Sequence, residues 1–187
     1  MTQTQEAQSV LAPGVWEIDP VHTNVEFVAR HLLSKVRGRF ASFSGNVLIA
    51  EDPEQSSVEV TIDAASVETG SPERNAHLRN ADFLDVERFP SLSFRSTKLR
   101  SGDGPGRYLL DGDLTIRDVT RPVTLDVEYH GWSDDPWGSQ RAGFSATTAI
   151  ERADYGASWN AVVETGGLVV GKTVRIELEV EAVRKAG

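Results

Sequence analysis

The segment TVRIELEVEAV, residues 173–183, alternates apolar and polar side chains over its whole length. Apolar positions two residues apart are typical of a β-strand with one buried and one solvated face. The segments NVEFVARH (24–31) and SVEVTIDAA (57–65) have the same period, and in the first of them His31 falls on the face of Phe27. A chain that repeats this pattern must bury one face of a sheet, so the sequence predicts an all-β core.

Five other segments carry the same signal, which predicts about eight or nine strands in a single domain. They are FSGNVLIA, SLSFRSTKL, RYLLDGDLTIR, VTLDVEYHG and RAGFSATTAIE. Strands buried on both faces read as continuous apolar runs, so the alternation favours an antiparallel sheet. The segment IRDVTRPV (116–123) predicts a short hairpin connection through Asp118 and Pro122. In HLLSKVRGRF (31–40) the alternation stops, which predicts a turn or a one-turn helix.

The chain of 187 residues has the length of one domain, expected here over residues 14–187. Residues 1–13 are small and polar, without a Lys, an Arg or an apolar run. They predict a flexible tail rather than a secretory signal or a membrane anchor, and hence a cytoplasmic protein. The formal net charge of −9 repels phosphate backbones, so nucleic acid is not an expected partner.

One polar segment, RNAHLRNADFLDVERFP (74–90), interrupts the strand pattern. Ser71 can cap a helix there, Pro72 suits its first position and Glu73 favours its positive end, so we expect a helix over about Pro72–Asn80. A helix this short must dock on a larger element to be stable. Leu78, Phe83 and Leu84 are the apolar groups available for docking. The segment is either a structural plug with a wet outer face or a lid that clamps a ligand head group.

The sequence offers little support for metal or hydrolytic chemistry. Its four histidines are far apart in sequence, without the paired spacing of zinc proteases, and there is no cysteine. Ser145 lies in an alternating strand rather than in a nucleophile elbow. The segment GGLVVG (166–171) precedes a strand and not a helix, so it reads as a turn rather than a phosphate loop. No metal, no cofactor and no catalytic residue are therefore predicted.

Phe27, Phe94 and Phe144 all fall on the apolar face of their strands. Ordinary core packing explains each of them, but a closed sheet of about eight strands can also enclose one small ligand. The periodicity does not separate a filled barrel from a hollow one. In either case the three rings are expected to face one continuous interior.

Six segments in order resemble the YceI-like family, over nearly everything from Gly14 to Ala182. They are DPVHTNVEFVARH, KVRGRFASFSGNV, SVEVTIDAASVETG, ERNAHLRNADFLDVERFPSLSFRST, GDLTIRDVTRPVTLDVEYHG and RAGFSATTAIERADYGASWN. The resemblance implies a lipocalin-like antiparallel β-barrel with one or two short helices. It also implies a long apolar cavity that binds a polyisoprenoid lipid, such as the prenyl chain of a quinone or an isoprenyl phosphate. Many members of the family have a signal peptide, which we do not expect in this sequence.

The resemblance also suggests which residues contact the ligand. The expected ligand-binding residues are Phe27, His31, Arg37, Phe40, Asn75, His77, Phe83, Phe94 and Phe144. Apolar members would contact the tail, while His, Arg and Asn side chains would donate to a quinone or phosphate head near the barrel opening.

We therefore expect a carrier or storage protein for a polyisoprenoid lipid, and neither an enzyme nor an integral membrane protein. Two alternatives stay open at this point: an enzyme that acts on such a lipid with a pocket histidine as acid or base, and a packed barrel that binds only protein. A homodimer is also compatible with the sequence.

Overall fold

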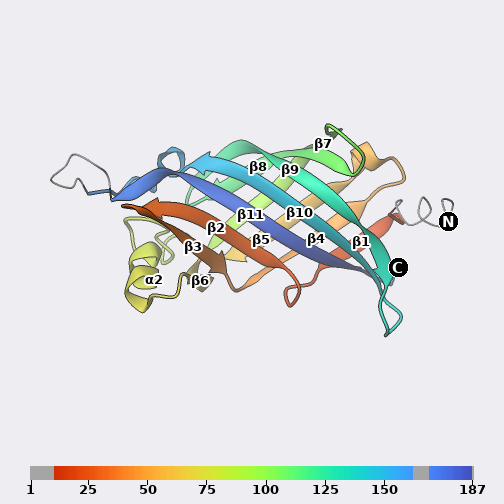
Figure 1. The fold of residues 1–187 in the computed structure, drawn as a ribbon, viewed down its shortest axis with the longest axis horizontal. Helices are drawn as coiled ribbons and strands as arrows, with labels where there is room; N and C mark the ends of the chain where they lie inside the picture. The colour runs from red at the N-terminus through yellow and green to blue at the C-terminus, as the bar shows by residue number, and fades with distance from the viewer. Residues whose placement is uncertain (1–10, 162–168, 187) are drawn as a thin grey trace.

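The computed structural model describes residues 11–161 and 169–186, which form one antiparallel sheet of eleven strands (Figure 1). Eight strands close into a barrel in the order β1-β4-β5-β7-β8-β9-β10-β11, because β1 also pairs with β11. They are β1 (Gly14–Ile18), β4 (Phe43–Ile49), β5 (Ser57–Asp63), β7 (Ser91–Ser101), β8 (Arg107–Ile116), β9 (Val119–Asp134), β10 (Gln140–Glu151) and β11 (Val170–Arg184). The predicted all-β antiparallel barrel is confirmed.

Three more strands extend the sheet from the edge of β11: β2 (Asn24–His31), β3 (Ser34–Phe40) and β6 (Val67–Glu68). Of the turn or one-turn helix expected within residues 31–40, the turn is confirmed at Leu32 and Leu33, and it joins β2 and β3 in a hairpin. Leu32 has a left-handed φ of 51°. Turns of this kind usually contain Asn or Gly, so the sequence there carries no hairpin signal.

The predicted hairpin at residues 116–123 is confirmed. Arg117 and Asp118 form the turn between β8 and β9, and Arg117 adopts a left-handed φ of 58°. Pro122 lies within β9 and pairs in register with Asp113 rather than belonging to the turn. Short 3₁₀ turns follow other strands: η1 (Pro53–Gln55), η2 (Ala64–Ser66) and η3 (Arg152–Tyr155).

Helix α2 spans Pro72–Arg79, as the capping pattern predicts. The Ser71 side chain accepts a hydrogen bond from the Arg74 backbone N–H at 3.3 Å. The helix lies at one end of the barrel, near the β2–β3 hairpin, whereas the pairing of β1 with the end of β11 lies toward the opposite end (Figure 1). We call these the α2 end and the β1 end.

Two apolar clusters fill different parts of the barrel. The cluster at the β1 end has Trp16, Ala142 and Ala182 at its centre, all with at most 1% of their surface exposed. The larger cluster reaches toward the α2 end and includes Phe94, Leu114 and Tyr155, with Leu84 packed against it. The alternation of the strands therefore buries one continuous inner face, as the sequence predicts.

Of the predicted tail over residues 1–13, residues 1–10 lie outside the described part of the chain. Leu11 and Ala12 pack against the cluster at the β1 end, and the Trp16 indole N–H donates to the Ala12 carbonyl oxygen at 3.0 Å. Packing against the barrel thus begins before β1. In the described ranges, no helix is both long enough and apolar enough to cross a membrane.

Candidate functional site: an apolar cavity inside the barrel

The barrel encloses a cavity of about 530 Å³. Its lining reaches from Leu11 and Pro13 at the β1 end to Leu78 and Phe83 at the α2 end. A volume of this size lies within the range of pockets that hold small-molecule ligands. The lining is overwhelmingly aliphatic and aromatic, so the interior is suited to an apolar ligand.

The aromatic residues expected to face one interior do so. Phe27, Phe94 and Phe144 all line the cavity, although they come from three separate strands. Phe40 and Phe83, which the family resemblance also suggests, are part of the same lining. The four phenylalanines on strands face the cavity because of the period of two, since neighbouring strands align their inner faces, whereas Phe83 lies in the turn after α2.

Two of these rings lie against glycines on neighbouring strands. A Cβ atom added at Gly38 would be 2.2 Å from Phe27 Cζ, and one added at Gly112 would be 2.4 Å from Phe94 Cζ. Both distances are far below van der Waals contact, so each ring occupies the space that a side chain would need. The two glycines therefore let large rings lie along the wall of the barrel rather than across its interior.

His77 lies at the α2 end, just outside the cavity lining. Its Nε2 atom is 2.8 Å from Asp82 Oδ2. Its ring packs in a T-shaped arrangement against the rings of Phe83 and Trp159, at centroid distances of 5.0 and 4.6 Å. Phe83 is buried and lines the cavity, as do Leu78 and Leu84. The helix and the residues after it therefore dock through the three apolar groups that the sequence indicates.

Asn75 is buried on the inner side of α2, where its side chain is used by the protein itself. Its Oδ1 atom accepts hydrogen bonds from the backbone N–H and the hydroxyl of Thr69, and its Nδ2 donates to Glu68. The Arg74 guanidinium donates to the Thr69 hydroxyl and carbonyl. These bonds anchor α2 to β6, so the predicted head-group donor Asn75 has no place in the cavity lining.

The expected positions of Arg37 and His31 beside the ligand are corrected by the structure. Arg37 lies on the outer face of β3, where its Nη1 donates to Glu26 at 3.0 Å and to Glu177 at 2.6 Å. The hydrogen bond that Arg37 donates to Glu177, followed by the negative charge of that carboxylate, raises the pKa of Arg37. His31 is exposed at the last position of β2. Lys35, Arg37 and Arg39 are two residues apart along β3, and this spacing indicates that all three side chains lie on the outer, solvated face of the strand.

Arg152 is a cavity-lining residue that the sequence did not indicate. Only 8% of its surface is exposed, and its guanidinium donates to four backbone carbonyls, those of Ala157, Trp159, Val170 and Gly171. Its guanidinium carbon also lies 5.7 Å from the centre of the Phe83 ring. Burial lowers the pKa of Arg152. The local sequence ERADYG has no feature that separates it from a surface turn.

Tyr129 is the second lining residue that sequence reasoning missed. Its ring packs against Phe144 with a centroid distance of 5.3 Å, and its hydroxyl oxygen is buried. Burial raises the pKa of Tyr129 to about 12, with a smaller contribution from Tyr108. The hydroxyl is therefore protonated at neutral pH and able to donate a hydrogen bond.

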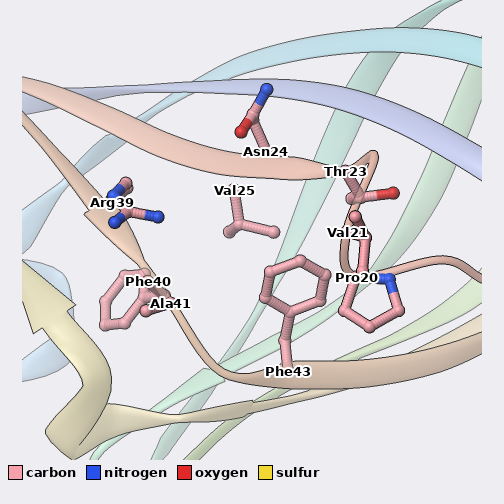
Figure 2. A pocket seen from close by; sticks show the side chains of 9 residues that line it. All are labelled: Pro20, Val21, Thr23, Asn24, Val25, Arg39, Phe40, Ala41 and Phe43. Carbon is pink, nitrogen blue, oxygen red and sulfur yellow. The ribbon is translucent and has the colours of Figure 1, made fainter.

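A second, smaller pocket lies beside the wall of the cavity where β2, β3 and β4 meet (Figure 2). Its volume is about 90 Å³, which is too small for a lipid. It shares Thr23, Val25, Phe40 and Phe43 with the large cavity. Those side chains thus form the partition between the two spaces, and the large cavity is the candidate ligand site.

Asp19, His22 and Glu181 bring three potential metal ligands within 4.8 Å of one another. The Arg141 guanidinium, however, donates to Asp19 at 2.8 Å and to Glu181 at 2.9 Å. Its positive charge already balances the carboxylates where a cation would have to sit. The cluster is therefore explained as a structural ion-pair network at the β1 end.

Ser145 lies on the outer face between His130 and Glu179. Its hydroxyl donates to both Glu179 oxygens, at 2.9 and 2.8 Å, and lies 2.6 Å from His130 Nε2. In a catalytic triad the histidine stands between the serine and the carboxylate, which orients it as a base. Here the serine occupies the middle position, so the arrangement lacks that chemistry.

Comparison with known proteins supports the assignment of the fold and the family. Residues 16–182 match the YceI-like domain, and the chain belongs to this family. It is 36% identical to a UPF0312 protein of Vibrio parahaemolyticus over 168 residues, which cover 88% of this chain and 83% of the relative.

Two solved structures have the same fold. BcnA of Burkholderia cenocepacia superimposes with a TM-score of 0.75 at 23% identity, over 88% of this chain and 98% of its own. A polyisoprenoid binding domain from Saccharophagus degradans, implicated in plant cell wall breakdown, has a TM-score of 0.69 at 17% identity, over 93% of this chain and all of its own.

Proposed function

We propose that this protein binds a polyisoprenoid lipid in the barrel cavity and acts as a carrier or store for it, without chemical conversion. The apolar cavity of about 530 Å³ is the observation that carries the proposal. An interior of this kind offers dispersion contacts and excludes water along a chain-like ligand. The domain from Saccharophagus degradans, described as polyisoprenoid binding, supports this choice of ligand class through a shared fold.

Binding should depend on the length of the apolar tail. Burying a methylene group contributes up to about 0.8 kcal/mol, and the ordering of the ligand offsets part of this gain. We expect the affinity for a series of prenyl alcohols to rise with each isoprene unit and to level off when the cavity is full. Calorimetry or quenching of tryptophan fluorescence measures this series. Affinity that does not change with tail length would contradict binding inside the barrel.

A pair of substitutions on β10 localises the binding. Ala146 is buried and lines the cavity, whereas Ala149 is exposed on the same strand. Ala146→Phe should shorten the usable cavity and move the plateau to shorter prenyl alcohols, while Ala149→Phe should leave the series unchanged. Equal effects of the two substitutions would place the ligand outside the barrel.

Native mass spectrometry of the purified protein, followed by organic extraction, tests the carrier role. Release of an intact prenyl lipid supports it. Slow conversion of an added prenyl lipid would instead favour an enzyme, and His77 with Asp82 at the α2 end would then be the acid–base pair to examine.

A further inference from the structure

The Tyr129 hydroxyl is one of two buried side-chain polar groups that have no hydrogen-bond partner in the described chain; the other is the Trp132 indole N–H. Buried polar groups in folded proteins are almost always paired, so each exception calls for a specific reason. Both residues pack against the cluster at the β1 end, but of the two Tyr129 alone lines the cavity. Only the tyrosine is therefore in a position to meet a ligand.

A β-bulge determines where this tyrosine points. The register of β9 and β10 shifts between Gly143, which pairs with Gly131, and Phe144, which pairs with Tyr129. His130 is the extra residue, and its ring contacts the Ser145 hydroxyl on the outer face. The bulge leaves Tyr129 in the wall beside Phe144. Bulges commonly re-aim a side chain in this way next to functional sites.

The surroundings of Tyr129 favour a neutral ligand atom. Among the described residues, the charged members of the lining are Glu26, Glu51 and Arg152. The Glu26 carboxylate pairs with Arg37 on the outer face, and the Arg152 guanidinium already donates to four carbonyls. A phosphate beside Tyr129 would be desolvated without a counter-charge, which is very costly. A carbonyl or hydroxyl oxygen needs only one donor.

We propose that the Tyr129 hydroxyl is the head-group contact of the cavity and donates a hydrogen bond to a neutral oxygen, the carbonyl of a prenyl quinone or the hydroxyl of a prenyl alcohol. This inference rests on the proposed function and sharpens it. It places the polar end of the lipid against β9 rather than beside His77, and it selects a neutral head over a phosphate. The apolar tail then extends along the rest of the lining.

The test compares three probes: geranylgeraniol, its hydrocarbon counterpart without the hydroxyl group, and geranylgeranyl phosphate. Their affinities are measured for the unsubstituted protein and for Tyr129→Phe, with Tyr108→Phe, a second tyrosine of the lining on the adjacent strand β8, as the matched control. His77→Ala probes the rival position at the α2 end. Thermal unfolding of each variant without ligand accompanies the binding data.

Tyr129→Phe should weaken geranylgeraniol binding about fivefold, which corresponds to a net hydrogen bond of about 1 kcal/mol. It should leave hydrocarbon binding unchanged and should not lower the melting temperature, because the hydroxyl has no partner in the protein. Tyr108→Phe and His77→Ala should change the alcohol affinity by less than twofold. The phosphate should bind no more tightly than the alcohol.

An unchanged alcohol affinity in Tyr129→Phe, a selective loss in Tyr108→Phe or His77→Ala, or tighter binding of the phosphate than of the alcohol would each overturn the inference. A clear fall in the melting temperature of Tyr129→Phe would also overturn it, since the hydroxyl would then serve the fold. If none of the three probes binds the unsubstituted protein, the proposed function itself fails, and this result is distinct from the others.

Discussion

The α2 end and the β1 end of the cavity differ in whether the polar groups in or beside its wall have hydrogen-bond partners. At the α2 end, Arg152 donates to four carbonyls and His77 is paired with Asp82, so the protein supplies the partners. Beside the cluster at the β1 end, the Tyr129 hydroxyl is buried without a partner. Polar residues near a cavity opening are therefore not in themselves a head-group site. What distinguishes a ligand contact is hydrogen-bonding capacity that the fold leaves unused.

The largest effect should come from Arg152→Met, because it removes the guanidinium donor from the carbonyls of Ala157, Trp159 and Gly171, whereas the Val170 carbonyl keeps a hydrogen bond from Asn160. Unpaired buried polar groups cost about 1–3 kcal/mol each, and partial relaxation will reduce the sum, so we expect a loss of at least about 2 kcal/mol in the free energy of unfolding. Urea denaturation measures it. Arg95→Met, which removes an exposed ion pair with Glu59, is the control and should cost less than about 1 kcal/mol.

A stable Arg152→Met variant that no longer binds prenyl alcohols would reverse the comparison between the two ends. Arg152 would then be a ligand contact, and its bonds to the carbonyls would be secondary.

A smaller effect is expected from Gly112→Ala, which tests how the cavity stays open. The added methyl group would meet the Phe94 ring at 2.4 Å and the Arg95 carbonyl oxygen at 2.8 Å, so the ring must move into the cavity. Overpacking of this kind costs about 1–3 kcal/mol, and the cavity should then accept only shorter prenyl alcohols.

Gly143→Ala is the matched control, because the nearest atom to its added methyl group is 3.6 Å away. It should leave the free energy of unfolding and the length series nearly unchanged. Similar effects of the two alanine substitutions would show that the position of the Phe94 ring does not set the size of the cavity.

The smallest effect concerns pH and the ion-pair network at the β1 end. The hydrogen bond from His22, together with that from Arg141, lowers the pKa of Asp19 to about 2. Because this pKa is below that of the unfolded chain, near 3.9, the carboxylate stabilises the fold above about pH 4 and loses this contribution as the pH falls toward 2. Solvent screening should limit the contribution to about 1 kcal/mol or less.

Between pH 5 and 2, the melting temperature of Asp19→Asn should therefore fall less steeply than that of the unsubstituted protein. The same slope in both proteins would show that Asp19 does not take part in the acid response. Prenyl alcohol binding at neutral pH should be the same in both, since Asp19 is not part of the cavity lining.

Much of the fold could be predicted from the sequence because the alternation of apolar and polar residues within one strand shows which side chains share each face of the sheet. Phe27, Phe94 and Phe144 face one interior since a period of two leaves no other choice once a face is buried. The capping residues Ser71 and Pro72 likewise predicted the start of α2. The β2–β3 hairpin was missed because its turn consists of two leucines, which carry no turn signal.

The candidate site depended on contacts between segments that are distant in the sequence. Arg37 belongs to the outer face, where Glu26 of β2 and Glu177 of β11 lie beside it, and the ring of His77 packs against Trp159. Whether the barrel is filled or hollow depends on large rings that lie against glycines of other strands. Periodicity determines which face a side chain occupies, but not how much space remains between opposite walls. The role of Tyr129 was likewise decided by the tertiary structure, because an unpaired hydroxyl can be recognised only once every neighbouring donor and acceptor is in place.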